Sequence, residues 1–126
     1  MKTAVIGQNK MNDSLLKWVV LVLERVQKYG WTLIIPDEPG VGQLCALVAD
    51  ARGIEYAIMK YREKPQIISY AGNYAQPKDH LPRPGRNDIL FEVVQAADLI
   101  IVLPHTKEIE DIKDWAQWQH KLVIEL

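Results

Sequence analysis

The chain has 126 residues, of which 48% are hydrophobic and 25% charged, with a formal net charge of −1 and one cysteine. This composition is ordinary for one soluble domain with a hydrophobic core. A single cysteine excludes an intramolecular disulfide, and the balanced charge excludes a broad surface for nucleic acid or anionic lipid. We therefore expect one domain over residues 1–126, a cytoplasmic location, and no membrane or nucleic-acid partner.

Strand-like apolar runs and helical patterns alternate along the whole chain. The runs end at glycine or proline, and Asp13 or Ser14 is a candidate N-cap for the first helix. The predicted strands are 3–7, 31–35, 55–61, 99–103 and 121–126, and the predicted helices are 13–29, 41–52, 87–97 and 106–119.

Residues 62–86 interrupt this alternation. They contain four of the seven prolines and no long apolar run. We interpret them as an ordered excursion within the domain, with a possible short edge strand at 66–70.

Alternating strands and helices imply right-handed crossovers and a mostly parallel sheet. We predict an α/β fold, a three-layer Rossmann-like domain of about five strands with helices on both faces. Numbered along the chain, the strands would lie in the order 3-2-1-4-5. In such sheets a ligand binds beyond the carboxyl ends of the strands, near the switch point between strands one and four.

The loop after the second strand, PDEPGVG, is a candidate part of this site. Gly40 and Gly42 permit close approach of a ligand to the backbone, and the next helix has no acidic residue in its first turn. However, Pro36 and Pro39 remove two amide donors, and a pair of acidic residues lies between them. The loop is therefore either a phosphate site or a rigid corner between two packed elements.

Two other loops bring charged residues to the same edge. Arg86 precedes a predicted helix in RPGRND, where arginine suits a phosphate or carboxylate, although it could equally be solvated. Glu108 and Asp111 lie in the first turn of the helix predicted from 106. There they complement the helix dipole, or one of them serves as a general acid or base. His105 stands where a strand meets a helix and could face the cleft.

The sequence predicts no metal site and no cofactor. The three histidines are scattered without ligand spacing, and no second cysteine is present. Cys45 lies on the apolar side of its predicted helix, which is typical of a buried small hydrophobe.

Several segments, taken in order, resemble the SLOG superfamily. These are AVIG near the N-terminus, PGVG before the second helix, GRN before the third helix and AADLIIVLP at the fourth strand. The superfamily includes the DprA/Smf proteins, the LOG phosphoribohydrolases and small YspA- or YpsA-like proteins. The likeness covers most of the chain except residues 62–82.

The resemblance implies a pocket for a nucleotide or nucleotide derivative, without carrying over a reaction. The paired glycines of the small members are replaced by Pro36 and Asp37, and the PGGxGTxxE motif of the LOG enzymes is reduced to PHTKEIED. The predicted ligand-binding residues are Gly7, Gln8, Pro39, Gly40, Val41, Gly42, Arg86, Asn87, His105 and Thr106.

The first predicted helix is apolar on more than one face. Leu16, Trp18, Val20 and Leu21 lie outside its main apolar stripe. Either neighbouring elements bury them, or the outer face meets a second copy of the chain. We expect a homo-oligomer, and Trp115 and Trp118 could extend the patch.

Three functional hypotheses follow from the sequence. The first is a small nucleotide-binding protein without robust catalysis. The second is a nucleotide N-glycosidase similar to the LOG enzymes, with Glu108 or Asp111 as the acid or base. The third is a structural oligomerisation domain.

Overall fold

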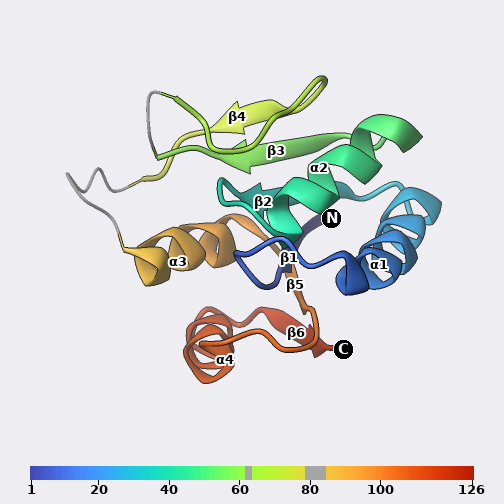
Figure 1. Cartoon of the computed structure of the whole chain (residues 1–126). Helices are drawn as coiled ribbons and strands as arrows, with labels where there is room; N and C mark the ends of the chain where they lie inside the picture. Colours follow the sequence, from blue (N-terminus) through green and yellow to red (C-terminus); the bar gives the residue numbers. More distant parts are fainter. Residues whose placement is uncertain (62–63, 79–84) are drawn as a thin grey trace.

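The computed structural model describes residues 1–61, 64–78 and 85–126. Strands and helices alternate and build one sheet between helices (Figure 1). The strands are β1 (Lys2–Ile6), β2 (Thr32–Pro36), β3 (Tyr56–Met59), β4 (Asn73–Ala75), β5 (Leu99–Val102) and β6 (Leu122–Glu125). The helices are α1 (Leu16–Lys28), which follows the 3-10 turn η1 (Asp13–Leu15), then α2 (Val41–Arg52), α3 (Arg86–Ala96) and α4 (Ile109–Trp118).

The sheet has the order β4-β3-β2-β1-β5-β6, and every pair of neighbouring strands is parallel. The predicted Rossmann-like α/β fold is confirmed. The predicted order of five strands corresponds to β3-β2-β1-β5-β6, and a sixth strand, β4, extends the sheet beside β3. The chain reverses its direction of travel across the sheet between β1 and β5, which is the switch point.

The edge strand lies at Asn73–Ala75, so the possible strand at 66–70 is wrong. In the actual structure, the backbone N–H groups of Gln66 and Ile67 donate to the carboxylate of Asp37. The side chain of Ile67 is buried in the core. This segment is therefore held by one acidic side chain and one apolar anchor instead of a strand ladder.

Helices cover both faces of the sheet. Val5 of β1 packs in the cluster formed with α1 and α2, whereas Ala4 and Ile6 pack in the cluster formed with α3 and α4. This alternation is expected of a strand buried on both faces. Because α1 and α4 lie on opposite faces, Trp115 and Trp118 do not extend the outer patch of α1.

Three helix starts differ from the sequence prediction, and the smallest difference is at α3, which begins at Arg86 instead of 87. Asn12, rather than Asp13 or Ser14, caps the first helical turn by accepting a hydrogen bond from the Ser14 N–H at 3.1 Å. The last helix begins at Ile109 instead of 106, because Glu108 has φ 62° and cannot continue a right-handed helix. Within the described residues, no helix combines the length and apolar character needed to cross a membrane.

Candidate functional site

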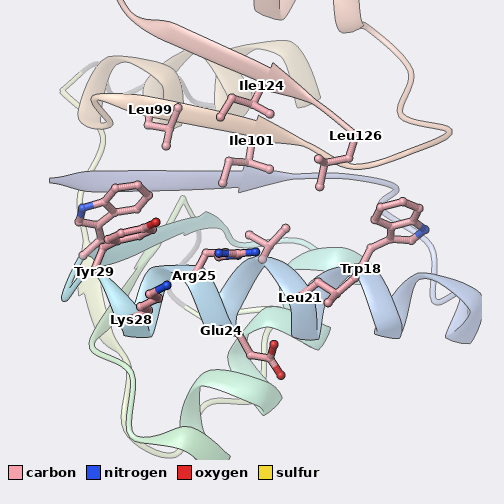
Figure 2. A pocket seen from close by; sticks show the side chains of 12 residues that line it. Trp18, Leu21, Glu24, Arg25, Lys28, Tyr29, Leu99, Ile101, Ile124 and Leu126 are labelled. Carbon is pink, nitrogen blue, oxygen red and sulfur yellow. The ribbon is translucent and has the colours of Figure 1, made fainter.

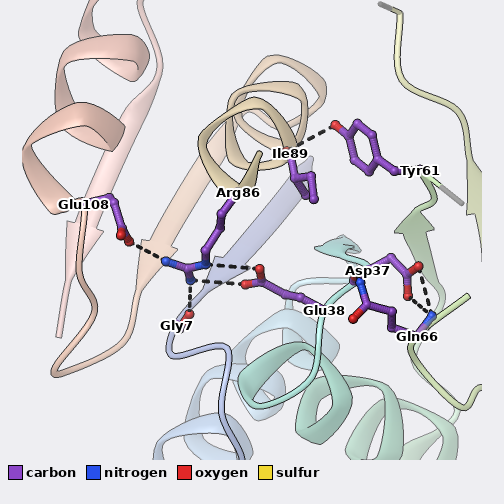
Figure 3. A network of polar contacts seen from close by, with 8 residues as sticks. All are labelled: Gly7, Asp37, Glu38, Tyr61, Gln66, Arg86, Ile89 and Glu108. Atoms are coloured by element: carbon purple, nitrogen blue, oxygen red, sulfur yellow. Dashed lines mark hydrogen bonds and ion pairs between the residues drawn. The ribbon is translucent and has the colours of Figure 1, made fainter. Parts of the chain in front are cut away.

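The loop after β2 contains two buried carboxylates. Asp37 and Glu38 are 2% and 5% exposed. Asp37 accepts from the backbone N–H of Gln66 at 2.9 and 3.1 Å (Figure 3). It also accepts from the backbone N–H of Ile67 at 2.9 Å. The negative charge of Asp37 is thus satisfied by the proline-rich segment, and this residue fixes where that segment lies.

The glycines of this loop allow it to pack against the loop after β1. Gly40 has φ 81°, and a Cβ there would lie 2.3 Å from the carbonyl oxygen of Gln8. The N–H of Val41, at the start of α2, donates to that same oxygen at 2.9 Å. A Cβ at Gly7 would meet the Val41 side chain at 2.4 Å, and one at Gly42 would meet the Pro36 oxygen at 2.9 Å. These contacts support the rigid-corner interpretation of the loop.

Arg86 is the first residue of α3 and connects three loops. Its Nε and one terminal nitrogen donate to the two carboxylate oxygens of Glu38 at 3.1 and 3.2 Å (Figure 3). The same terminal nitrogen donates to the Gly7 carbonyl at 2.7 Å, and the other forms an ion pair with Glu108. A guanidinium has five N–H donors, and these four hydrogen bonds leave one of them without an acceptor among the residues that the structure describes. Arg86 thus binds carboxylates of the chain itself.

The burial of Glu38 has an electrostatic consequence. Desolvation raises the pKa of its carboxyl above the ordinary value, and the hydrogen bond and positive charge of Arg86 oppose that shift. Glu108 and Asp37 add smaller contributions that raise the pKa further. Arg86 therefore compensates a charge that the loop after β2 buries at the switch point.

The loop after β5 has an unusual backbone. His105 and Glu108 have φ 63° and 62°, in the left-handed region that favours glycine. The Thr106 hydroxyl donates to the Leu103 carbonyl and so closes the turn. Gln8 in turn donates from its side-chain amide to the His105 carbonyl at 3.3 Å, which ties this loop to the loop after β1.

A polar cavity of about 230 Å³ lies beside Arg86, between the loops after β1 and β5. It is at the carboxyl ends of these strands, where Rossmann-like sheets hold ligands. Three cationic side chains line it, and an exposed histidine stands at its edge. The lining residues are Gln8, Asn9, Lys10, Arg86, His105 and Lys107.

The cavity contains three of the predicted ligand-binding residues, namely Gln8, Arg86 and His105. The other predicted residues either hold the surrounding loops together or lie outside the cavity. Gly7, Gly40, Val41 and Gly42 pack the loops together, Thr106 closes the turn, and Pro39 and Asn87 are exposed outside the lining.

Of the two catalytic candidates, Glu108 is paired with Arg86, whereas Asp111 is exposed on α4 and does not line the cavity. The sequence interpretation overlooked Lys10 and Lys107 as lining residues and Glu38 as the partner of Arg86. Lys10 and Lys107 lie in the loops that follow β1 and β5, so the switch-point rule itself was the available signal. Nothing in the local sequence pairs Glu38 with Arg86.

Metal binding and cysteine chemistry are not supported by the described residues. Among the residues that the structure describes, no three His, Cys, Asp or Glu side chains gather as metal ligands. Cys45 is buried within α2, and desolvation raises the pKa of its thiol. A thiol in that state is a poor nucleophile.

The fold and the position of the cavity define a Rossmann-like α/β protein with a polar pocket at the switch point. Among solved structures, the molybdenum cofactor carrier protein of Chlamydomonas reinhardtii is similar, with a TM-score of 0.71 and 12% identity. The match covers 98% of this chain and 74% of that protein. No family model and no curated protein sequence matches the chain. At this identity the likeness establishes the fold alone.

Proposed function

We propose that the protein binds a small phosphorylated ligand, a nucleotide or nucleotide derivative, in the cavity beside Arg86. The observation that carries this proposal is the coincidence of the cavity with the switch point of the sheet. The molybdenum cofactor carrier has the same fold, and its name describes a carrier of a small ligand. This supports a binding role for the present chain.

The charges around the cavity favour an anionic group. Lys10, Lys107 and Arg86 bring three positive charges, and Glu38 and Glu108 bring two negative ones to Arg86. The two lysines form none of these pairs, so a phosphate would be held mainly by them and by the remaining N–H of Arg86. Such charge-assisted hydrogen bonds are stronger than neutral ones.

Membership of the SLOG superfamily is part of the proposal. Aligning Pro104 with the proline of the PGGxGTxxE motif puts the first and third glycines at His105 and Glu108. These two residues adopt the left-handed conformation that glycine favours. A left-handed backbone at these two positions is one that glycine would accommodate, and it supports the proposed membership although the glycines themselves are replaced.

The same alignment favours binding without robust catalysis. The motif's catalytic glutamate falls at Ile112, which is buried and cannot transfer a proton. Glu108 falls on a glycine position and is neutralised by Arg86. The alternative, an N-glycosidase, would need Glu108 to leave this ion pair.

We also propose a cytoplasmic location and self-association through the outer face of α1. Leu16 is 42% exposed there, and Val20, one turn further on, is half-buried. Such a small patch suits a weak symmetric contact.

Thermal denaturation with the four common ribonucleoside monophosphates tests the binding proposal, with the nucleosides as unphosphorylated controls. A ligand at about 100 times its Kd should stabilise the protein by about 2.7 kcal/mol. Lys10→Ala and Lys107→Ala should weaken binding, whereas Lys113→Ala, outside the cavity, should not.

The alternatives give different results. Stabilisation by nucleosides and monophosphates alike would contradict the phosphate contact. Release of free base, lost in Glu108→Gln, would establish the glycosidase instead. No response to any nucleotide, together with a stable oligomer, would favour the structural domain.

A further inference from the structure

A second concave surface lies on the opposite side of β5 from α3 and α4. Helices α1 and α2 cover β1, β2 and β3 on that face, and Leu99 and Ile101 of β5 are buried in the same cluster, but no described helix covers β6 there (Figure 2). The result is an apolar groove of about 600 Å³ between α1 and β6, a volume within the range of small-molecule sites. It shares no lining residue with the cavity beside Arg86.

The floor and ends of the groove are apolar. Leu99 and Ile101 of β5 and Ile124 of β6 form the floor, with Trp18 at one end and Tyr29 at the other (Figure 2). Ile124 remains 46% exposed although it points into the groove. This face of β6 thus leaves apolar side chains in water, which a ligand with an apolar body would cover.

A positively charged side chain, Arg25, lies beside the apolar floor of the groove. The guanidinium of Arg25 extends from α1 over the groove (Figure 2). No carboxylate of the described residues forms an ion pair with it. The neighbouring Glu24 turns away and pairs with Arg52 of α2 at 3.4 Å, so it does not neutralise Arg25. Lys28, over the ring of Tyr29 at 5.7 Å, adds a second positive charge at the Tyr29 end of the groove.

We propose that this groove binds a small carboxylate with an aromatic or aliphatic body. The body lies on the floor of β5 and β6, and the carboxylate accepts two hydrogen bonds from Arg25, whose planar fork matches its geometry. A second copy of the chain docked symmetrically in the groove would instead bring two Arg25 side chains onto apolar floors. Glu24, the one acidic side chain among the described lining residues, is already paired with Arg52. Unpaired charge of that kind is costly to desolvate. The free guanidinium therefore favours the anionic ligand.

The test uses cinnamate and its uncharged isostere cinnamamide, titrated into the labelled protein and followed by NMR. Cinnamate should shift the indole signals of Trp18 and of Trp31, which also lines the groove, and the methyl signals of Ile124. It should leave Gln8 in the cavity beside Arg86 unmoved. Cinnamamide should bind about tenfold more weakly, since it lacks the charge that Arg25 recognises.

Two variants test separately how much the Arg25 contact and the apolar floor contribute to binding. Arg25→Gln should weaken cinnamate about tenfold and leave cinnamamide unchanged. The matched control Lys64→Gln, which removes an exposed positive charge that does not line the groove, should change neither. Ile124→Asp should abolish binding of both probes, with thermal melts confirming that each variant is folded.

Three results would overturn the proposal. They are equal binding of the acid and the amide, retention of cinnamate affinity in Arg25→Gln, and absence of shifts at millimolar probe. Groove signals that depend on protein concentration, with a dimer in sedimentation, would show a second copy as the occupant and would also overturn it. None of these results bears on nucleotide binding beside Arg86.

Discussion

Arg86 and Glu38 are joined by two hydrogen bonds, at 3.1 and 3.2 Å, across 48 positions of the sequence. Their side chains are 20% and 7% exposed. The pair links the start of α3 to the loop after β2, and the further contacts of Arg86 with Gly7 and Glu108 bring in the loops after β1 and β5. The residue expected to clamp a ligand is thus also the residue that holds the switch point together.

Glu38→Gln should lower the free energy of unfolding by about 3 kcal/mol, because it leaves the partly buried Arg86 with one charge partner, Glu108, instead of two. Denaturant unfolding measures the change. Glu24→Gln is the matched control, since it breaks an exposed pair with Arg52 and should cost less than about 1 kcal/mol. If both variants lost the same free energy of unfolding, burial of the Arg86–Glu38 pair would not increase its contribution to stability.

Gly40→Ala should destabilise the protein by more than about 2 kcal/mol. The new Cβ would combine a left-handed backbone with a 2.3 Å approach to the Gln8 oxygen. Gly30→Ala isolates the backbone effect, because Gly30 has φ 65° but no neighbouring atom within 4 Å of the added Cβ. Thermal melts of both variants should show the larger loss at Gly40, and the reverse order would contradict the packed-corner interpretation.

His105→Gly should leave stability unchanged or raise it by up to about 1 kcal/mol. Glycine removes the strain of the left-handed conformation, while the greater entropy of its unfolded chain offsets part of the gain. Gln117→Gly, at an exposed position inside α4, should instead cost about 1 kcal/mol. A loss at His105 as large as at Gln117, measured by urea unfolding, would mean that the side chain of His105 stabilises the loop.

Tyr56→Phe should change how stability depends on alkaline pH. Burial, and then the hydrogen bond donated to Asp50 at 2.6 Å, raise the pKa of Tyr56 from 10.0 to about 12. The folded state therefore holds the phenolic proton more tightly than the unfolded state does. This stabilisation is fully present below pH 10 and is lost as the pH rises towards 12.

Unfolding measured from neutral pH upward should show a weaker alkaline decline in Tyr56→Phe than in the wild type. The variant should also lose about 1–2 kcal/mol at neutral pH, through the hydrogen bonds to Asp50 and Ser69. Tyr70→Phe, at a side chain that is 83% exposed, should follow the wild-type pH curve. If Tyr56→Phe showed the same dependence of stability on pH as the wild type, Tyr56 would not be the source of the alkaline decline.

The Rossmann-like architecture was predictable because it depends on local patterns. Apolar runs ending at glycine or proline, such as residues 31–35 and 99–103, alternate with helical segments, and right-handed crossovers then fix the strand order. The strand β4 was not predictable. Its residues, Asn73–Ala75, are mostly exposed and carry little apolar pattern, so only pairing with β3 defines them.

The sequence also indicated the end of the sheet where the cavity lies, but not which residues around it pair with one another. The switch-point rule brought Gln8, Arg86 and His105 to one end of the sheet, and the structure places all three around one cavity. It could not show that Arg86 is engaged by Glu38 and Glu108, because ion pairs between loops depend on how the loops pack.

The loop that begins with Pro36 shows most clearly what the sequence determines and what the tertiary structure determines. By itself the sequence determined that this loop turns sharply, since proline fixes φ and glycine permits positive φ. Only the tertiary structure decided what the turn does. Asp37 holds the segment at Gln66, Glu38 holds Arg86, and Gly40 packs on Gln8, contacts that span 29, 48 and 32 positions. Local pattern sets the conformation of a loop, whereas its partners are set by the strands that bring distant segments to one edge of the sheet.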